Sequence, residues 1–240
     1  MISVIIPTLN EERYLPRLLA SIRAQDFRDL EVIVADFDSV DRTTEAARPF
    51  GARVVSGGVP AVGRNAGARA ARGEYFLFVD ADVKLPPGFI SALFARFQED
   101  YIDICVPSLE PIDGDKPIYR AIFRFLNGVY KLLEFLKPQA SGACILVTRR
   151  LHERIGGFDE SRTRSEDLNY INRAAKVGRY RCYRDIYVYF SVRRFEAEGV
   201  GSLVRKYLRA GFIYFFSNRQ DRKPAYDYGR FGRGRAGSLL

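Results

Sequence analysis

Acidic side chains follow three apolar runs in the first third of the chain. Asp80 and Asp82 come directly after one apolar run, and Asp36 and Asp38 come after another. Glu11 follows the first run, near the start of the chain. Carboxylates gathered in one place repel each other unless a positive charge neutralises them, and a divalent cation with oxygen ligands is the usual solution. These acids therefore predict a cation site that keeps positions open for phosphate groups.

Two acid groups, Asp80 with Asp82 and a further pair at Glu166 and Asp167, also have an interpretation in local structure alone. Asp80-Ala81-Asp82 can be a turn in which Asp caps the residues that follow, but the apolar residues 76–79 favour a site, because a rigid strand delivers both carboxylates. Glu166 and Asp167 begin a predicted helix, whose N-terminus favours negative charge. A carboxylate at that position can also take a proton from a weakly acidic hydroxyl group.

Apolar segments and helical patterns alternate along the chain, and these elements must position the acids. The apolar runs predict strands at residues 3–7, 31–35, 53–55 and 75–79, and later at 144–147 and 180–192. Helical spacing predicts helices at residues 15–22, 43–48, 65–72, 89–97, 118–137 and 166–177. Asn10 is expected to cap the first helix. This order predicts an α/β fold with a Rossmann-like doubly wound, mainly parallel sheet and helices on both faces. Ligands then bind at the carboxyl ends of the strands.

The positive charge of the chain is concentrated near its end. The chain has 240 residues and a net charge of +9. Residues 178–240 contain 14 basic and 5 acidic residues, so this part alone carries 14 − 5 = +9. We expect one domain over residues 1–198 and a basic, aromatic segment over residues 199–240, whose end is flexible. Such a basic segment predicts an anionic partner.

Several classes of protein are disfavoured by what the sequence lacks. It has no GxxxxGK[ST] loop, and no GxGxxG follows a strand, so the usual nucleotide cradles are missing. An apolar run of membrane-spanning length and a secretory signal are also missing, which predicts a cytoplasmic protein. Three widely spaced cysteines indicate a reducing compartment, and His152, the single histidine, is expected to be a surface or packing residue.

Taken in order, a set of short segments resembles an inverting family 2 glycosyltransferase of the GT-A fold. They are Ser3 to Glu11, Glu31 to Asp36 with Ser39, Asp41 and Thr43, Gly63-Arg64-Asn65-Ala66-Gly67, Gly73 to Asp82, Ser141-Gly142, Gly156-Gly157-Phe158-Asp159-Glu160, and Glu166-Asp167. Each is short, but together they cover roughly residues 1–180 in the expected order. The resemblance implies a nucleotide-sugar half over residues 1–100 and an acceptor half over residues 101–198.

The resemblance also implies a role for each matching residue in binding the donor. The implied nucleotide-sugar ligands are Pro7, Leu9 and Glu11 for the nucleoside, Asp36 and Asp38 for base and ribose, and Arg64, which otherwise reads as a solvated cation at a helix start. Asp80 would contact ribose or metal, and Asp82 would bind Mg²⁺ or Mn²⁺ on the diphosphate. Arg205 and Arg209, in the basic segment, are candidates to share the diphosphate charge or to contact lipid. Phe37 stands where a second acidic residue is frequent in the family. The resemblance therefore leaves open whether the nucleotide base is uracil or guanine.

For catalysis, the resemblance implies that Asp167 is the general base and that Glu166 orients or binds beside it. The reaction would move one sugar from a UDP- or GDP-sugar to a hydroxyl of a lipid-linked or glycan acceptor, because the QxxRW signature of processive synthases is missing. An alternative enzyme is a polyprenyl-phosphate glycosyltransferase, whose ionised acceptor needs no base. An alternative of another class is a basic nucleic-acid-binding protein that uses the Arg- and Gly-rich tail.

Two amphipathic stretches suggest contact with a membrane surface. In residues 118–137, apolar side chains repeat at intervals of three and four and most polar positions are basic, as in interfacial helices. Residues 203–216 have a similar character. These amphipathic helices of the C-terminal half predict a peripheral protein on the cytoplasmic face of the membrane. The alternative is that both stretches pack on the sheet or form an oligomer interface.

Overall fold

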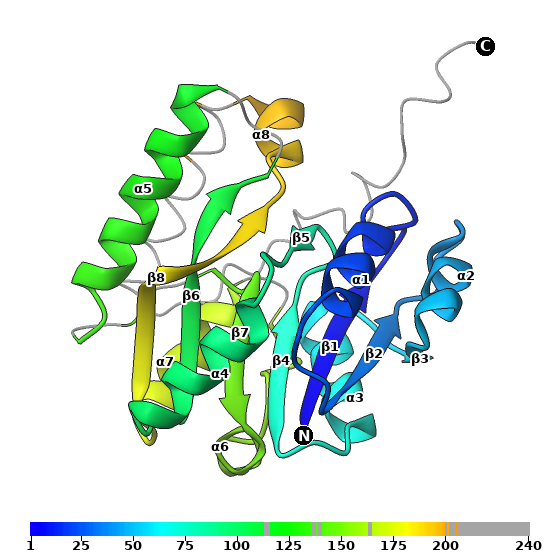
Figure 1. Cartoon of the computed structure of the whole chain (residues 1–240), viewed down its shortest axis with the longest axis horizontal. Helices are drawn as coiled ribbons and strands as arrows, with labels where there is room; N and C mark the ends of the chain where they lie inside the picture. Colours follow the sequence, from blue (N-terminus) through cyan, green and yellow to red (C-terminus); the bar gives the residue numbers. More distant parts are fainter. Residues whose placement is uncertain are drawn as a thin grey trace.

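The computed structural model describes residues 1–112, 116–135, 138, 141–162, 165–199, 201 and 205, apart from the side chain of Arg194. Eight strands of this part form one sheet in the order β3-β2-β1-β4-β7-β6-β8-β5 (Figure 1). The strands are β1 (Ile2–Thr8), β2 (Leu30–Asp36), β3 (Arg53–Ser56), β4 (Tyr75–Val79), β5 (Val83–Lys84), β6 (Ile104–Pro111), β7 (Cys144–Thr148) and β8 (Tyr180–Phe190). β3, β2, β1 and β4 are parallel to one another, and β7 is antiparallel to both β4 and β6.

Helices cover both faces of this sheet, because the central strands are apolar on both sides. In β1, Val4 and Ile6 belong to one buried core while Ile5 belongs to the other. The helices are α1 (Leu15–Arg23), α2 (Thr43–Ala47), α3 (Pro60–Ala70), α4 (Phe89–Glu99), α5 (Pro117–Leu132), α6 (Arg149–Arg154), α7 (Glu166–Ala175) and α8 (Arg193–Glu198), with a 3-10 turn at Arg48–Phe50. The predicted doubly wound, mainly parallel α/β fold is therefore confirmed.

The antiparallel strand β7 brings a second part of the chain to the functional edge of the sheet. Val79, at the carboxyl end of β4, lies opposite Cys144, at the start of β7. The backbone N–H of Asp80 donates to the carbonyl of Ala143 over 3.0 Å. Ser141 and Gly142, which precede β7, therefore lie beside the acids that follow β4, although some sixty residues separate them in sequence.

Several local predictions differ from the structure. Asn10 does not cap the first helix, which begins at Leu15 after Tyr14. Asn10 has a left-handed backbone with φ 56°, and its side chain accepts a hydrogen bond from the N–H of Val40. Helix α3 begins at Pro60 rather than at residue 65, because Pro suits the first turn of a helix. Strand β6 and helix α6 were not predicted.

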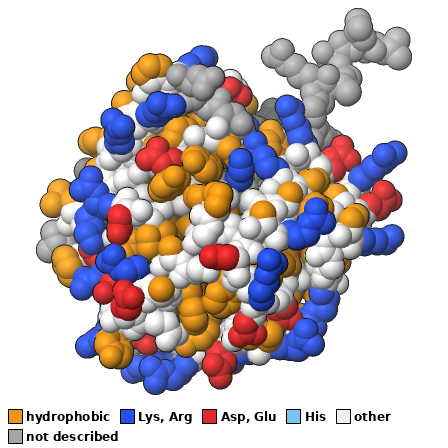
Figure 2. All heavy atoms as spheres, in the orientation of Figure 1, with side chains coloured by type: hydrophobic (Ala, Val, Ile, Leu, Met, Phe, Trp, Pro, Cys, Tyr) orange, Lys and Arg blue, Asp and Glu red, His pale blue; other side chains and the backbone are white. Residues whose placement is uncertain are grey.

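Helix α5 packs on β6 and β8 at one end of the sheet and leaves apolar side chains uncovered. Its buried residues are Tyr119, Phe123 and Asn127, spaced by four. Phe125 is 62% exposed and Leu132 is 75% exposed. Figure 2 shows hydrophobic and basic side chains next to each other along the edge of the molecule where Figure 1 places α5. Of the second amphipathic stretch, 203–216, only Arg205 lies within the described residues. No helix in the described part of the chain is both long and apolar enough to cross a bilayer.

Candidate active site

Arg64 joins two groups of acids at the carboxyl edge of the sheet. It lies on α3, and it is buried rather than solvated at a helix start. Its Nη2 contacts Oδ1 of Asp80 at 2.7 Å, and its Nη1 contacts Oε1 of Glu166 at 2.9 Å. Gly67, one turn further along α3, allows this helix to lie close to β1, because a Cβ there would clash with Ile5. The close packing of α3 holds the guanidinium between β4 and α7.

Electrostatics keep Arg64 charged in this buried position. Burial alone would lower the pKa of its guanidinium, but the negative charges of Asp80, Glu166 and Asp167 raise the pKa above its ordinary value. The ring of Phe158 lies 5.3 Å from the guanidinium carbon and adds a cation–π contact. Arg64 is therefore a fixed positive charge that positions the acid after β4 relative to the acids that begin α7.

Asp167 lies at the start of α7 in a geometry that suits a proton acceptor. Its Oδ2 accepts a hydrogen bond from the N–H of Gly142 at 2.8 Å, and its Oδ1 accepts one from the N–H of Leu168 at 2.8 Å. A Cβ on Gly142 would lie 2.6 Å from the Cβ of Asp167, so only glycine fits there without a shift. Each carboxylate oxygen keeps a second lone pair for a substrate proton.

The protonation of Asp167 is tuned toward neutral pH. Burial raises the pKa of this carboxyl to about 6, and the negative charge of Glu166 adds to the rise. Arg64 and the two backbone hydrogen bonds oppose the rise. Asp167 is thus a stronger base than an ordinary aspartate, yet it is still largely ionised at pH 7.

Phe158, in the segment Gly156-Gly157-Phe158-Asp159-Glu160, contacts both α3 and α7 and so helps to orient the Glu166–Asp167 pair. Asn65 of α3 accepts a hydrogen bond from the N–H of Phe158 at 2.8 Å and donates one to its carbonyl at 2.8 Å. The Phe158 ring stacks on Tyr170 of α7 at 3.8 Å between centroids. Tyr170 in turn contacts His152, whose ring packs against Phe76, so of the two predicted roles, surface or packing, His152 has the packing one.

Glu11 and Asp82 form a second cluster, around Arg193. The two terminal nitrogens of Arg193 contact the two carboxylate oxygens of Glu11 at 2.7 and 2.8 Å. Its Nε lies 2.9 Å from Oδ2 of Asp82. Sequence reasoning missed Arg193, although it is a basic residue that directly follows a predicted strand in the basic end of the chain. Pairing of β8 with β5 brings it here, since Val83 lies opposite Phe190.

Asp82 can hold a metal only together with other ligands. Its side chain is 2% exposed, and Oδ2 is buried without a hydrogen bond, which suits an oxygen that ligates a cation. Asp80 is instead paired with Arg64. No group of three or more His, Cys, Asp or Glu residues that could hold a metal occurs in the described part of the chain. One buried carboxylate fits a Mg²⁺ or Mn²⁺ ion that is otherwise bound by donor phosphates and water.

The other predicted donor ligands lie along the ends of β1 and β2. Pro7 and Leu9 are half-buried there. Asp36 accepts hydrogen bonds from Thr8 and from the hydroxyl and N–H of Ser39, so its carboxylate shapes its own loop. Asp38 is exposed, with φ 48°. Arg205 is exposed and makes no contact with the site among the described residues, and Arg209 lies outside the described residues.

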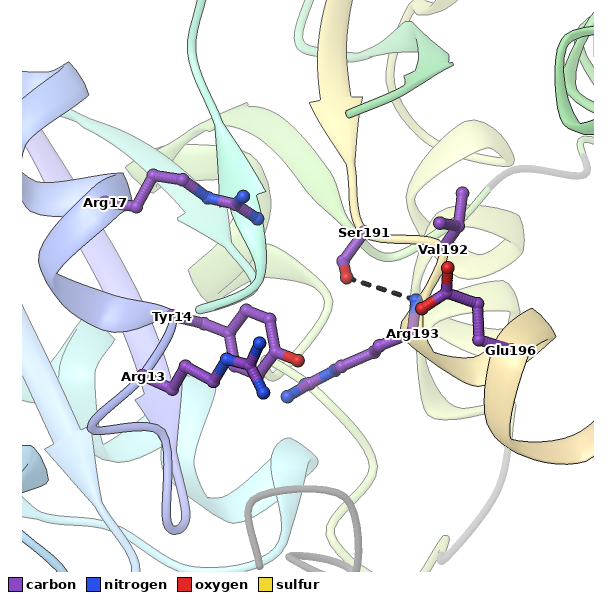
Figure 3. Close-up of a pocket in the computed structure, with 7 residues that line it drawn as sticks. All are labelled: Arg13, Tyr14, Arg17, Ser191, Val192, Arg193 and Glu196. Carbon is purple, nitrogen blue, oxygen red and sulfur yellow. Dashed lines mark hydrogen bonds between the residues drawn. The ribbon is translucent and has the colours of Figure 1, made fainter. Parts of the chain in front are cut away.

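A cavity of about 240 Å³ opens beside Arg193. Its lining residues come from the start of α1 and from the segment around the start of α8: Arg13, Tyr14, Arg17, Ser191, Val192, Arg193 and Glu196. Figure 3 shows the side chains of Arg13 and Arg193 ending beside the Tyr14 ring and that of Arg17 ending above it in this view. Their guanidinium carbons lie 4.4 to 5.9 Å from the ring centroid. The cavity therefore offers positive charge next to the Glu11–Asp82 cluster.

Acids at the carboxyl edge of a mainly parallel sheet and an acidic pair at the start of α7 agree with the predicted GT-A fold. Comparison with protein families agrees, since residues 3–156 match the family described as glycosyl transferase family 2. The chain belongs to this family, as its sequence motifs predicted. The family match favours the transferase over the nucleic-acid-binding alternative.

Individual relatives match parts of the chain. A poly(ribitol-phosphate) beta-N-acetylglucosaminyltransferase, TarS of Staphylococcus aureus, is 30% identical over 122 residues, 47% of this chain and 21% of TarS. A GalNAc(5)-diNAcBac-PP-undecaprenol beta-1,3-glucosyltransferase of Campylobacter jejuni is 34% identical over 113 residues, 43% of this chain and 36% of that enzyme. The matched regions thus span well under half of these relatives.

A mannosyltransferase structure shows the same fold. The enzyme PcManGT from Pyrobaculum calidifontis, solved in complex with GDP-Man and Mn²⁺, superposes with a TM-score of 0.67 at 23% identity. The superposition covers 87% of this chain and 64% of that one.

Proposed function

We propose that this chain transfers one sugar from a UDP- or GDP-sugar to an acceptor hydroxyl with inversion at the anomeric carbon. The observation that carries the proposal is the Arg64 cluster, which holds Asp80 on one side and the Glu166–Asp167 pair on the other. The donor binds along the ends of β1, β2 and β4, and the acceptor approaches from α7. Family membership and the Mn²⁺ and GDP-Man in the mannosyltransferase structure support a nucleotide-sugar donor.

Asp167 acts as the general base in this proposal. The acceptor oxygen attacks the anomeric carbon while Asp167 takes its proton, and the bond between that carbon and the diphosphate oxygen breaks on the opposite face. A sugar hydroxyl is a weak nucleophile, so proton removal in step with attack lowers the barrier. Glu166 contacts Arg64. We therefore assign it the role of orienting the site and not that of accepting the proton.

The negative charge that develops on the leaving diphosphate must be stabilised. Asp82 would hold a divalent ion, Mg²⁺ or Mn²⁺, and such an ion would supply this stabilisation. Within the chain, Arg64 balances the charge of Asp80, and we assign Asp80 the role of orienting the ribose or the diphosphate.

A lipid-linked acceptor is supported by the surface of α5. Exposed Phe125 and Leu132 lie on the same helix as the exposed cations Arg120 and Arg124, which suits an anionic bilayer surface. The undecaprenol in the name of the Campylobacter relative supports the same class of acceptor. We therefore propose a peripheral enzyme that brings a water-soluble donor to an acceptor at the cytoplasmic membrane surface.

The first test is a thermal-shift screen of UDP- and GDP-sugars with and without Mn²⁺. A donor at a hundredfold excess over its dissociation constant should stabilise the protein by about 2.7 kcal/mol. Glycan and lipid-linked acceptors are then supplied with the stabilising donor, and the anomeric configuration of the product is read by NMR. No stabilisation by any nucleotide sugar, or a product with retained configuration, would refute the proposal.

A further inference from the structure

Arg193 holds two carboxylates that the proposed donor and its metal would otherwise use. It makes a two-pronged ion pair with Glu11 and a third contact, through Nε, with Asp82. Its side chain is 12% exposed, and its guanidinium lies 4.4 Å from the Tyr14 ring centroid. Burial alone would lower the pKa of this guanidinium, but the charges of Asp82 and Glu11 raise it, so Arg193 is a permanent cation.

The contact between Arg193 and Asp82 is incomplete. Nε of Arg193 and Oδ2 of Asp82 are both buried, and neither makes a hydrogen bond despite their 2.9 Å separation. A buried charged atom without a hydrogen bond forgoes part of the energy that would offset its desolvation. Arg193 and Asp82 are therefore held together by charge alone. Either atom would be stabilised by a ligand with which it can form a bond of better geometry.

The charges around Arg193 favour such an exchange. Two carboxylates, Glu11 and Asp82, share the one guanidinium of Arg193. The adjoining cavity offers Arg13 and Arg17 on its wall, with Glu196 as its acidic residue. A guanidinium binds phosphate oxygens in the same two-pronged manner as a carboxylate.

We propose that Arg193 is a donor-binding residue that exchanges its carboxylates for the donor diphosphate and thereby opens Asp82 to a divalent cation. The inference rests on the proposed function and adds Arg193 to the residues that bind the donor. In the free protein Arg193 occupies the place of the cation on Asp82. With the donor bound, Arg193 turns to the diphosphate in the adjoining cavity. Metal and donor then bind together, while metal alone must compete with an internal cation.

The experiment measures Mn²⁺ alone and nucleotide alone on the full chain. Calorimetry with MnCl₂ gives the metal affinity of wild type, Arg193→Gln, Arg193→Lys and Asp82→Asn. A second titration, in EDTA, gives the affinity for UDP and GDP. Arg96→Gln is a matched control, since Arg96 also pairs with two carboxylates, Asp100 and Asp185, and lies 5.4 Å from a tyrosine ring.

Removal of the competing cation should strengthen metal binding and weaken nucleotide binding. We expect Arg193→Gln to bind Mn²⁺ at least about tenfold more tightly than wild type, and UDP or GDP about tenfold more weakly. Arg193→Lys should fall between the two, because one ammonium cannot span Glu11 and Asp82. Combining Arg193→Gln with Asp82→Asn should abolish the gain in metal affinity, and Arg96→Gln should match wild type.

Each arm can overturn the inference separately. Equal Mn²⁺ affinities for wild type and Arg193→Gln would show that Arg193 does not compete for Asp82. Equal nucleotide affinities would show that Arg193 does not bind the diphosphate. If wild type binds no nucleotide under any condition, the proposed function fails, whereas the Mn²⁺ titration still decides the competition. Arg193→Lys keeps the comparison possible if loss of the charge prevents folding.

Discussion

The backbone N–H of Gly142 donates a hydrogen bond to Oδ2 of Asp167 over 2.8 Å, and a Cβ on Gly142 would lie 2.6 Å from the Cβ of Asp167. The turn before β7 and the start of α7 thus touch at the carboxylate that we assign as the base. Gly142 has no chemistry of its own, but it sets where that carboxylate stands relative to Arg64 and Asp80.

Gly142→Ala should therefore displace the base without removing it. A shift of about 1 Å in a positioned group can cost about 10²-fold in rate, so kcat should fall by that order while donor affinity stays near wild type. Gly128→Ala is the control, because a Cβ there meets nothing within 4 Å and alanine favours its helix, α5. A kcat equal to that of Gly128→Ala would contradict the contact.

Asp167→Asn should abolish proton acceptance and nearly preserve shape. Loss of a positioned general base costs about 10² to 10⁴ in rate, and the donor dissociation constant should change little because the side chain faces the acceptor. Asp185→Asn, at a side chain that is 65% exposed, is the control for loss of a carboxylate. If rate and donor affinity fall together, Asp167 belongs to the donor pocket or the fold.

Turnover should depend on the ionisation of Asp167. Its pKa is raised to about 6, and only the ionised form accepts a proton, so kcat/KM should rise with pH through about 6 and level off above it. The rising limb should disappear in the residual activity of Asp167→Asn. A limb near pH 4 in wild type would indicate an unperturbed carboxyl at this position.

The same raised pKa predicts that the free energy of unfolding falls over the pH range in which kcat/KM rises. An ordinary aspartate ionises near 3.8, so between about pH 4 and 6 the folded protein binds more protons at Asp167 than the unfolded chain does. Its free energy of unfolding therefore falls as pH rises through that window. Relative to Asp167→Asn, wild type should lose up to about 3 kcal/mol between those limits, measured by urea unfolding. The comparison cancels His152, which titrates in both proteins.

Arg64 should matter far more for stability than a neighbouring arginine. Arg64→Gln leaves Asp80 and Glu166 without their shared cation, and breaking a buried ion pair costs about 3 to 5 kcal/mol. Arg69→Gln, on the same helix, removes an exposed pair with Glu160 and should cost less than about 1 kcal/mol. Urea unfolding of both variants tests this, and equal losses would refute the central role of Arg64.

The sequence predicts the parts of the site that follow apolar strands, because each strand and its acid are neighbours in the chain. Asp80 and Asp82 were placed in this way. Arg193 could not be placed in this way, because its contacts depend on how β8 pairs with β5 and β6. It also lies more than a hundred residues after Glu11 in the sequence. Strand β6 was hidden by Pro107, which argues against a strand but here lies at a register shift. Asn10 does not cap α1, because its side chain binds the loop after β2.

The apolar surface of α5 should bind an anionic bilayer. The helix buries Tyr119, Phe123 and Asn127 against the sheet, and Asn127 exchanges two hydrogen bonds with the backbone of Leu109. This anchoring fixes which side faces outward, and Phe125 and Leu132 are on it. An interfacial helix buries such side chains at the head-group boundary while nearby cations contact anionic lipid. Each cation near the surface contributes about 1 kcal/mol, and salt screens that contribution.

Phe125→Glu should therefore weaken binding to vesicles that contain anionic lipid, measured by co-sedimentation at low salt. The change replaces buried apolar area with a charge that the head groups repel, so the bound fraction should fall several-fold, and wild type itself should bind less at high salt. Tyr101→Glu makes the same kind of change at an aromatic residue that is 77% exposed at the end of α4 and should leave binding unaltered. If wild type stays in the supernatant at low salt, α5 does not meet lipid. The alternative is then a protein partner or a second copy of the chain, which sedimentation equilibrium of Phe125→Glu against wild type would detect.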